Sequence, residues 1–349
     1  VAFYHDALSA TPSKLIQSLT CISTSQGPYP WRLRALLGQL LDIAQDNLFA
    51  QVRANTRDPL PAPRLFHATE HLLPRFKSIK TVFTLHDLIF KFFPQYHLPR
   101  NRIFLNLAMP LFLKRADAII CVSEHTRRDA MKEYGLPEEK MRVIYEGVHP
   151  RFRRVADGEV LRAAQARYRL PDRFILAVGT VEPRKNLARL AEALALLRRD
   201  DRSLELVVVG AKGWLYDEFF ARVRELGLEH AVHLPGYVPD DDLPAVFRAA
   251  TVYVMASVYE GAGLPVLEAM ACGAPVVSSR ESSMPELGAD VARYFNPYDV
   301  QHMADVIGMV LADDRLRAEM AAAGPERAAR FSWQRAARET LAVYQRLLS

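Results

Sequence analysis

The 349-residue sequence is poor in cysteine, with only Cys21, Cys121 and Cys272, which lie far apart. An odd number of cysteines at wide spacing argues against a disulfide framework. No cysteine or histidine pairs have the spacing of a zinc site. We therefore expect reduced thiols, with Cys121 and Cys272 in protein cores.

The sequence also lacks several motifs that would indicate other classes of protein. No run of eighteen apolar residues predicts a membrane-spanning helix. Neither the G-x-x-x-x-G-K-[ST] loop of ATP-binding proteins nor the G-x-S-x-G turn of hydrolases occurs. No basic stretch with interleaved aromatic residues indicates nucleic acid as a partner. The start, VAFYHDALSA, has no signal-peptide pattern, so we expect a cytoplasmic protein.

The net charge of +5 is unevenly distributed along the chain. The first 150 residues contain 19 Lys and Arg against 13 Asp and Glu, and the remainder contains 26 against 27. A basic first half fits an anionic membrane surface, although ordinary surface charge explains it equally well. The apolar stretch Phe104–Leu113 beside Lys114 and Arg115 is likewise either a core helix or a peripheral membrane contact.

Apolar, β-branched runs alternate with helical patterns along the chain, which is typical of an α/β protein with parallel sheets. The runs are nearly continuous rather than alternating, as expected for strands covered by helices on both faces. The expected strands are Lys80–Leu85, Ala118–Val122, Arg142–Tyr145, Phe174–Val178, Leu204–Val209, Ala231–Leu234, Val252–Met255, Pro275–Ser278 and Ala292–Phe295. The expected helices are Gln39–Arg53, Ser123–Tyr134, Ala188–Arg198, Leu215–Leu226, Asp242–Ala249 and Pro265–Ala271.

The length and the pattern predict two doubly wound domains. The turn-rich, basic segment Glu146–Arg154 separates them, so we assign residues 1–150 and 151–330 to the two domains. Residues 331–349 form a C-terminal helix with an apolar stripe, which we propose packs back on the first domain.

The segment Ala256–Ser279 (ASVYEGAGLPVLEAMACGAPVVSS) is the most informative part of the sequence. Glu260 and Glu268 stand eight residues apart, and Gly261 and Gly263 between them lead into a short helix. A helix N-terminus with glycine access attracts anions. The carboxylates would repel a phosphate, so we expect them to bind sugar hydroxyls. Together they indicate a nucleotide sugar as the ligand.

Three further loops follow strands of the second half. Gly179-Thr-Val-Glu-Pro-Arg-Lys-Asn186 brings Arg184 and Lys185 to a strand end, where they suit a polyanion. Gly210-Ala-Lys-Gly-Trp214 and Pro235-Gly-Tyr-Val238 are binding loops or plain turns. In the first half, His86 ends a strand and could reach a cleft between the domains.

The acidic run Asp240–Asp242 is better explained as a helix cap than as a metal site. The acidic run therefore does not point to a metal site.

These motifs, in this order, resemble the retaining GT-B glycosyltransferases of family 4. The resemblance rests on EGAGLPVLEAMACGAPVV, GTVEPRKN, VVVGAKGW, LPGYVPDDDL, TLHDL, ICVSEHTRRDA and FSW, and it covers roughly Phe66 to the C-terminus. The nearest subgroup resembles bacterial mannosyltransferases of surface polysaccharide assembly. The resemblance implies a GT-B fold with two Rossmann-like domains facing a cleft, a nucleotide sugar such as GDP-mannose or UDP-glucose, and a saccharide or lipid-linked acceptor.

The resemblance also implies the site residues. Lys185, helped by Arg184, would bind the pyrophosphate, Glu268 the ribose and Glu260 the transferred sugar. His86 would approach from the first domain, so His86, Lys185 and Glu260 are the candidate catalytic residues. The remaining donor-binding candidates are Gly179, Thr180, Gly210, Lys212, Tyr237, Val238, Gly261, Ala262, Gly263 and Leu264.

The sequence departs from the family pattern at three places. Thr180 stands where many relatives have Arg, and Ala262 stands where many have Phe. The first 65 residues match poorly, so we expect the N-terminal domain to lack the family's first β-loop-α unit. An incomplete domain leaves two alternatives open: a nucleotide-sugar-binding protein with little activity, and a homo-oligomer that completes the sheet.

Overall fold

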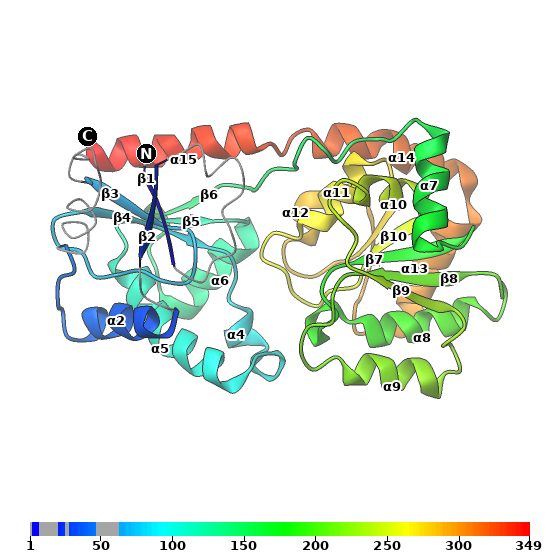
Figure 1. Cartoon of the computed structure of the whole chain (residues 1–349), viewed down its shortest axis with the longest axis horizontal. Coiled ribbons are helices and arrows are strands. Elements are labelled where there is room, and N and C mark those ends of the chain that lie inside the picture. The colour runs from blue at the N-terminus through cyan, green and yellow to red at the C-terminus, as the bar shows by residue number, and fades with distance from the viewer. Residues whose placement is uncertain (1, 7–19, 25–27, 47–62) are drawn as a thin grey trace.

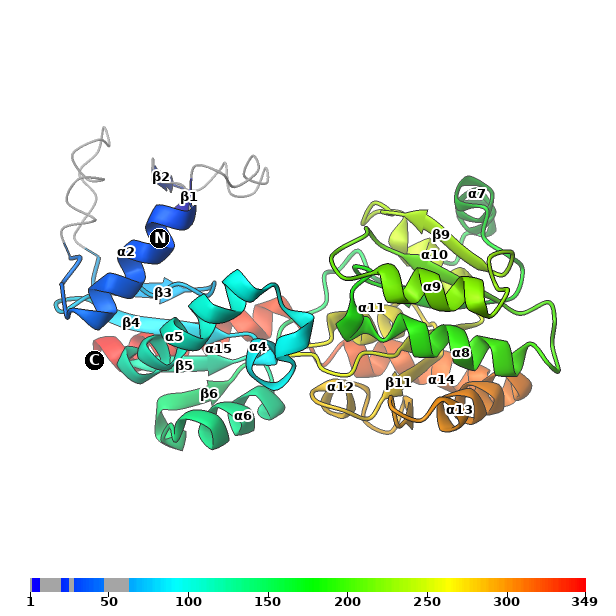
Figure 2. The same ribbon diagram turned by 90° about the horizontal axis from the view of Figure 1, so that it is seen from below.

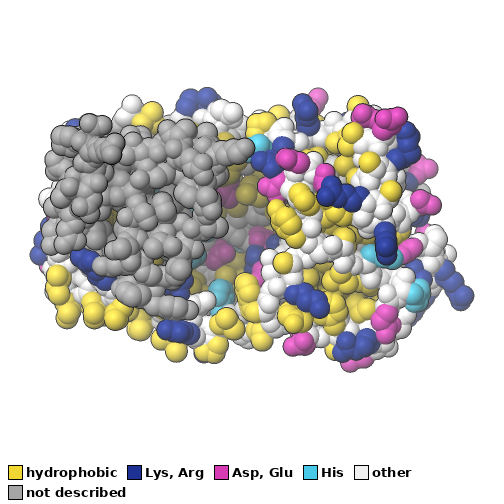
Figure 3. Space-filling view, viewed as in Figure 1, with side chains coloured by type: hydrophobic (Ala, Val, Ile, Leu, Met, Phe, Trp, Pro, Cys, Tyr) yellow, Lys and Arg dark blue, Asp and Glu magenta, His cyan; other side chains and the backbone are white. Residues whose placement is uncertain are grey.

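The computed structural model describes residues 2–6, 20–24, 28–46 and 63–349, with side chains from residue 32 onward. Two α/β units lie side by side, each built on a parallel sheet (Figure 1). A hollow separates them on the face seen in Figure 3. The prediction of an α/β protein with two units is confirmed.

The N-terminal unit contains a four-stranded parallel sheet in the order β3-β4-β5-β6. Its strands are β3 (Leu65–Ala68), β4 (Lys80–Leu85), β5 (Ala118–Cys121) and β6 (Met141–Val143). Its helical elements are α2 (Pro28–Leu40), α4 (Ile89–Phe92), η1 (Pro94–Tyr96), α5 (Pro99–Arg115), α6 (Glu124–Tyr134) and η2 (Glu138–Lys140). A separate parallel pair is formed by β1 (Ala2–Asp6) and β2 (Thr20–Thr24).

Helix α5 shows that one face of the apolar stretch in the first half belongs to the core. Met109, Phe112 and Leu113 are fully buried in the core of the N-terminal unit, so Phe104–Leu113 is a core helix. Its opposite face is not covered, because Ile103 and Leu107 are exposed.

The C-terminal unit contains a six-stranded parallel sheet in the order β12-β11-β10-β7-β8-β9. The strands are β7 (Phe174–Val178), β8 (Glu205–Val209), β9 (Val232–Gly236), β10 (Val252–Met255), β11 (Val276–Ser279) and β12 (Arg293–Phe295). The helical elements are α7 (Gly158–Tyr168), η3 (Pro183–Lys185), α8 (Leu187–Leu197), α9 (Asp217–Glu225), α10 (Leu243–Ala249), α11 (Leu264–Ala271), α12 (Met284–Gly288), α13 (Val300–Ala312) and α14 (Asp314–Ala328).

Helices cover both faces of this second sheet. Alternate residues of β8 point to opposite sides: Leu206 and Val208 join one hydrophobic cluster, and Val207 and Val209 join another. Because both faces are buried, the strand reads as a continuous apolar run. This explains why β7 and β10 have the bounds that the sequence predicts.

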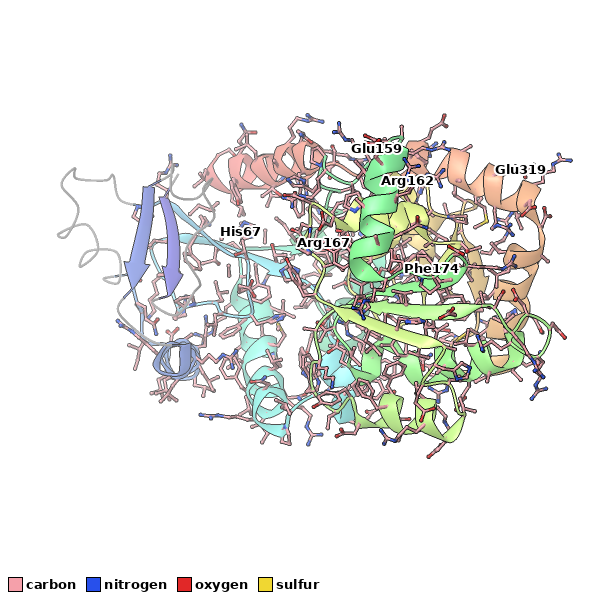
Figure 4. All side chains as sticks on the ribbon, turned by 45° about the vertical axis from the view of Figure 1, so that its right-hand side comes forward. His67, Glu159, Arg162, Arg167, Phe174 and Glu319 are labelled. Atoms are coloured by element: carbon pink, nitrogen blue, oxygen red, sulfur yellow. The ribbon has the colours of Figure 1, made fainter. Side chains whose placement is uncertain are left out.

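The last helix, α15 (Trp333–Leu348), leaves the C-terminal unit and lies along the N-terminal sheet (Figure 1). Ser332 caps it by accepting a hydrogen bond from the Arg335 N–H at 3.2 Å. Val343 packs with Val82 of β4 and its neighbours. The Tyr344 hydroxyl lies 2.5 Å from Nδ1 of His67, on β3 (Figure 4).

The helix expected at Gln39–Arg53 is wrong in its described part. Helix α2 ends at Leu40, and Asp42 adopts a positive φ of 54°. The Gln45 N–H then donates to the Arg75 carbonyl at 2.7 Å, which ties this segment to the loop before β4. Residues 47–53 lie outside the described residues, as does much of the region where we expected the missing first unit.

Candidate active site

Two loops at the carboxyl edge of the C-terminal sheet pack directly on each other. Gly179 follows β7 and Gly210 follows β8, with φ of +140° and +147°. A Cβ atom on Gly210 would lie 2.1 Å from the Gly179 carbonyl oxygen, and one on Gly213 would lie 2.4 Å from Cγ2 of Thr180. Only glycine allows this approach, so the two loops form one continuous floor.

Lys185 crosses this floor and ends beside Glu260. A Cβ atom on Gly179 would lie 2.9 Å from Cε of Lys185, so the lysine stem occupies the space above the glycine. Its ammonium group lies 2.8 Å from Oε1 of Glu260. The loops that carry Lys185 and Glu260 therefore meet at one sheet edge, as the sequence predicts, although these residues are 75 positions apart.

Glu260 lies at the centre of a cluster of charged and polar side chains, and the residue is only 7% exposed. Its carboxylate accepts hydrogen bonds from Arg184, from Lys185 and, at 2.7 Å, from the Ser257 hydroxyl. Its own N–H donates to the Ser282 hydroxyl at 2.8 Å. Burial alone would raise the pKa of Glu260, but the two cations outweigh it and lower the pKa to about 2. The side chain is therefore ionised and held in place from several sides.

Arg184 lies between two carboxylates. Its guanidinium donates to Oε1 of Glu182 at 2.6 Å as well as to Glu260. Burial would lower the pKa of Arg184, but Glu260 and Glu182 together raise it. With both carboxylates bound, Arg184 holds Glu260 in position, and Lys185 is the cation better placed for an incoming anion.

The glycine turn after Glu260 starts helix α11. Gly263, with φ of +66°, is its N-cap residue and provides no side-chain cap. The first-turn N–H groups of an α-helix have no partner within the helix, so this end is suited to an anion. Ala262 and Leu264 flank Gly263 in this turn.

Glu268 lies on α11, one turn further along. Burial, and then the negative charge of Asp240, raise its pKa to about 7, against a smaller opposite effect of Lys185. Within the described part of the chain, its carboxylate has no hydrogen-bond or ion-pair partner. A partly buried carboxylate without a donor is suited to ligand hydroxyl groups.

His86 approaches the same turn from the N-terminal unit. A Cβ atom on Gly261 would lie 1.9 Å from the His86 carbonyl oxygen, so the two backbones touch across the cleft. The His86 ring has Nε2 2.8 Å from the Thr69 carbonyl and Nδ1 3.6 Å from a carboxylate oxygen of Glu146. Burial raises the pKa of Glu146, and His86 partly offsets this effect.

Two of the expected donor-binding residues, Lys212 and Val238, have side chains that pack against other parts of the protein. The Lys212 ammonium group lies over the ring of Phe220, a residue of helix α9, at 4.7 Å from the ring centre. Val238 is 2% exposed and belongs to the core, while Tyr237 is 70% exposed. The expected donor contact of the backbone at residues 237–238 stays a prediction.

Sequence reasoning missed several groups that shape the site: Glu182, Ser257, Ser282 and Glu146. Glu182 stands two residues before Arg184, and that short spacing is a signal for the pair. Ser282 comes 22 residues after Glu260, and nothing in the sequence indicates their hydrogen bond.

No group of three or more His, Cys, Asp or Glu side chains in the described residues could hold a metal ion. None of the helices in the described ranges is long and apolar enough to span a membrane.

Comparison with known proteins identifies the family. The model "Glycosyltransferase Family 4" matches residues 24–152, and "Glycosyl transferases group 1" matches residues 163–327. O-antigen chain mannosyltransferase B of Escherichia coli is 32% identical over 286 residues, which is 81% of this chain and 74% of the relative. The chain belongs to glycosyltransferase family 4.

A second relative of this family 4 glycosyltransferase is the serotype-specific mannosyltransferase WbdA of Escherichia coli. It is 31% identical over 277 residues, which cover 77% of this chain and 34% of the relative. The resemblance to mannosyltransferase-like members of family 4 is therefore confirmed. The family match begins at residue 24, earlier than the quoted motifs indicate.

Solved structures support the GT-B fold. Sucrose-phosphate synthase from Thermosynechococcus elongatus superposes with a TM-score of 0.74 and 23% identity, over 95% of this chain and 84% of that one. Anabaena HepE in complex with UDP and glucose has a TM-score of 0.72 and 20% identity, over 95% and 88%. The predicted GT-B architecture of this glycosyltransferase is confirmed.

Proposed function

We propose that this glycosyltransferase moves a hexose from a nucleoside-diphosphate sugar to a saccharide or lipid-linked acceptor, with retention at the anomeric carbon and without a metal ion. Mannose is the first choice of sugar and glucose the second. The two relatives named above, at 32% and 31% identity, are both mannosyltransferases, and this supports mannose and hence GDP-mannose as the donor.

The proposal rests on one observation above all: Lys185 and the start of α11 flank an ionised, immobilised Glu260 directly opposite His86. A diphosphate between Lys185 and the helix N-terminus would be neutralised as its charge grows. Glu260 would then bind hydroxyls of the transferred sugar, and Glu268 those of the ribose. The backbone contacts of the glycine turn would fix the sugar relative to His86.

The chemical step that we propose is a front-face displacement. The bond between the anomeric carbon and the diphosphate oxygen breaks, and the acceptor hydroxyl attacks from the same face. Its proton passes to the departing phosphate oxygen, which leaves as part of the nucleoside diphosphate. Glu260 is not assigned a nucleophilic role, because its carboxylate is already bonded to Arg184, Lys185 and Ser257.

A donor panel tests the proposal. Purified protein is mixed with GDP-mannose, UDP-glucose and related donors, with oligosaccharide and lipid-linked acceptors, and release of nucleoside diphosphate is followed with and without EDTA. We expect release of nucleoside diphosphate that EDTA leaves unchanged. We also expect NMR to show that the product has the same anomeric configuration as the donor. Binding without release for every pair would favour the alternative, a nucleotide-sugar-binding protein.

A specific surface supports a lipid-linked acceptor at a membrane. Eight of the 17 exposed large hydrophobic side chains in the described residues lie on α2, α5 and their flanking turns: Leu33, Leu37, Leu40, Leu41, Ile43, Leu98, Ile103 and Leu107. The two helices pack side by side on one face of the N-terminal unit (Figure 2). The two helices carry six Arg and Lys residues and no Asp or Glu, and Asp42, in the turn after α2, forms an ion pair with one of the six, Arg115. A basic apolar face fits the surface of an anionic bilayer.

Flotation with anionic vesicles tests this contact. We expect the protein to float with vesicles containing phosphatidylglycerol, and the double variant Ile103→Ser/Leu107→Ser to float at least threefold less. Leu341→Ser, an equally exposed leucine on α15, is the matched control. Wild-type protein that stays with the soluble fraction would dismiss the contact. Self-association is a separate prediction, which sedimentation velocity measures.

A further inference from the structure

Glu286 of the C-terminal unit binds the start of a helix in the N-terminal unit. It lies on α12, and its side chain is only 15% exposed. One carboxylate oxygen accepts from the His125 N–H at 2.7 Å, and the other accepts from the Glu124 N–H at 2.8 Å. Both N–H groups belong to the first turn of α6. The Tyr145 hydroxyl adds a third hydrogen bond at 3.0 Å.

These N–H groups have no partner inside their own helix. The side chain of Ser123, the N-cap residue of α6, accepts from the Thr126 N–H at 3.1 Å and from neither of these two N–H groups. The cap of α6 is therefore completed by the other unit of the protein. A carboxylate at this end also interacts favourably with the helix dipole.

Glu286 is rigidly connected to the donor side of the site. Ser282 and Ser283, just before α12, bond to the N–H and carbonyl of Glu260 at 2.8 and 3.0 Å. From behind, the Arg327 side chain of α14 donates to the carbonyl oxygens of Glu286 and Leu287, at 2.5 and 2.7 Å. The position of Glu286 therefore follows that of Glu260.

The capped helix is connected in the same way to the opposite wall. The Thr126 hydroxyl, in the first turn of α6, donates to the His86 carbonyl at 3.3 Å. A Cβ atom at position 261 would collide with the same carbonyl oxygen, so only glycine fits there. The contacts thus form a closed ring around the cleft. Glu286 is one of two carboxylates that join α6 to the C-terminal unit, because the Tyr259 hydroxyl also donates to Asp129 of α6 at 2.6 Å.

We propose that Glu286 is a positioning residue for sugar transfer: by capping α6 it holds His86 and the Gly261 turn at their working separation. The proposal deepens the transferase function proposed above and rests on it. In the proposed site the donor-binding residues all belong to the C-terminal unit, so loss of the cap would slow transfer and leave donor affinity nearly unchanged.

The test uses Glu286→Gln, which preserves the shape of the side chain but places an NH2 group where the carboxylate accepts a hydrogen bond. Backbone hydrogen exchange at Glu124 and His125 is expected to become about tenfold faster, as for loss of a charged helix cap. With the donor identified by the panel, kcat should fall at least tenfold while the donor KM stays within twofold. Glu319→Gln, on α14 far from the N-terminal unit (Figure 4), is the matched control and should change neither quantity.

Two results would overturn the proposal. Unchanged exchange at Glu124 and His125 would mean that the cap is not formed in solution, and faster exchange with unchanged kcat would mean that it does not serve transfer. Wild-type protein that transfers no sugar would instead refute the proposed function. The exchange measurement needs no donor, so it still decides whether Glu286 caps α6.

Discussion

Replacing Glu268 with glutamine should change ligand affinity and stability in opposite directions. The carboxylate lies partly buried on α11 and has no partner among the described residues, so a ligand with adjacent hydroxyls would supply its hydrogen bonds. A hydrogen bond to a charged group contributes about 1.5–3 kcal/mol. Glu268→Gln should therefore weaken binding of the nucleoside diphosphate by roughly 10- to 150-fold.

The stability effect follows from the pKa of Glu268, which burial raises from 4.5 to about 7. Because the folded protein disfavours the charged form, stability is lost as the pH rises from 4.5 to 7. Linkage gives a destabilisation below about 1 kcal/mol at pH 5 and of about 3 kcal/mol at pH 8. Glu268→Gln removes the buried charge, so it should stabilise the unliganded protein by about 3 kcal/mol at pH 8.

Calorimetric titration with the nucleoside diphosphate measures the first effect, and urea unfolding at pH 5 and pH 8 measures the second. Glu229→Gln, an exposed glutamate of the same unit, is the control and should leave both unchanged. A variant that binds the nucleotide as tightly as wild type would remove Glu268 from the site. A gain in stability of the same size at both pH values would refute the assignment to an uncompensated buried charge.

Three further predictions concern the centre of the site and the metal. Glu260→Gln should destabilise the protein by about 3 kcal/mol at pH 7, because Lys185 loses its buried counter-charge. The folded protein holds the pKa of Glu260 at about 2, so the stability that the carboxylate provides is lost as the pH falls below 4.5. Urea midpoints should therefore show the difference between variant and wild type shrinking below pH 4.5. Gly261→Ala should cut the transfer rate at least tenfold with nucleotide affinity within twofold, because a Cβ atom would collide with the His86 carbonyl; equal loss in Gly158→Ala would contradict this. Lys185→Met should lower the rate of transfer about 100-fold in single-turnover assays. EDTA should leave the rate of the wild-type protein unchanged, and turnover that depends on a metal ion would refute the mechanism.

The central strands of the C-terminal unit could be predicted closely because β7, β8 and β10 are covered on both faces. Phe174–Val178 and Val252–Met255 have the expected bounds, since a strand buried on both faces reads as a nearly continuous apolar run. The N-terminal unit was harder. The short edge strand β3, with only Ala68 buried, has no such signal, and the helix expected at Gln39–Arg53 ends where a positive φ at Asp42 turns the chain.

The site could be predicted where adjacency follows from topology alone. Loops after neighbouring parallel strands emerge at one edge, so Lys185 and Glu260 were expected to meet. Lys212 emerges at the same edge but turns to Phe220 and Tyr216, aromatic residues eight and four positions further along. Side-chain direction depends on such competing partners, and topology does not specify it.

The sequence by itself determined the family, the parallel α/β architecture and the residues of the glycine turn after Glu260, because these depend on local patterns and on strand order. Only the tertiary structure decided how that turn is used. It showed that Arg184 is held by two carboxylates, that Gly261 touches the backbone of His86, and that Glu286 caps a helix of the other unit. These contacts join residues up to 175 positions apart, and their distances depend on how two separately packed cores dock, which no local pattern records.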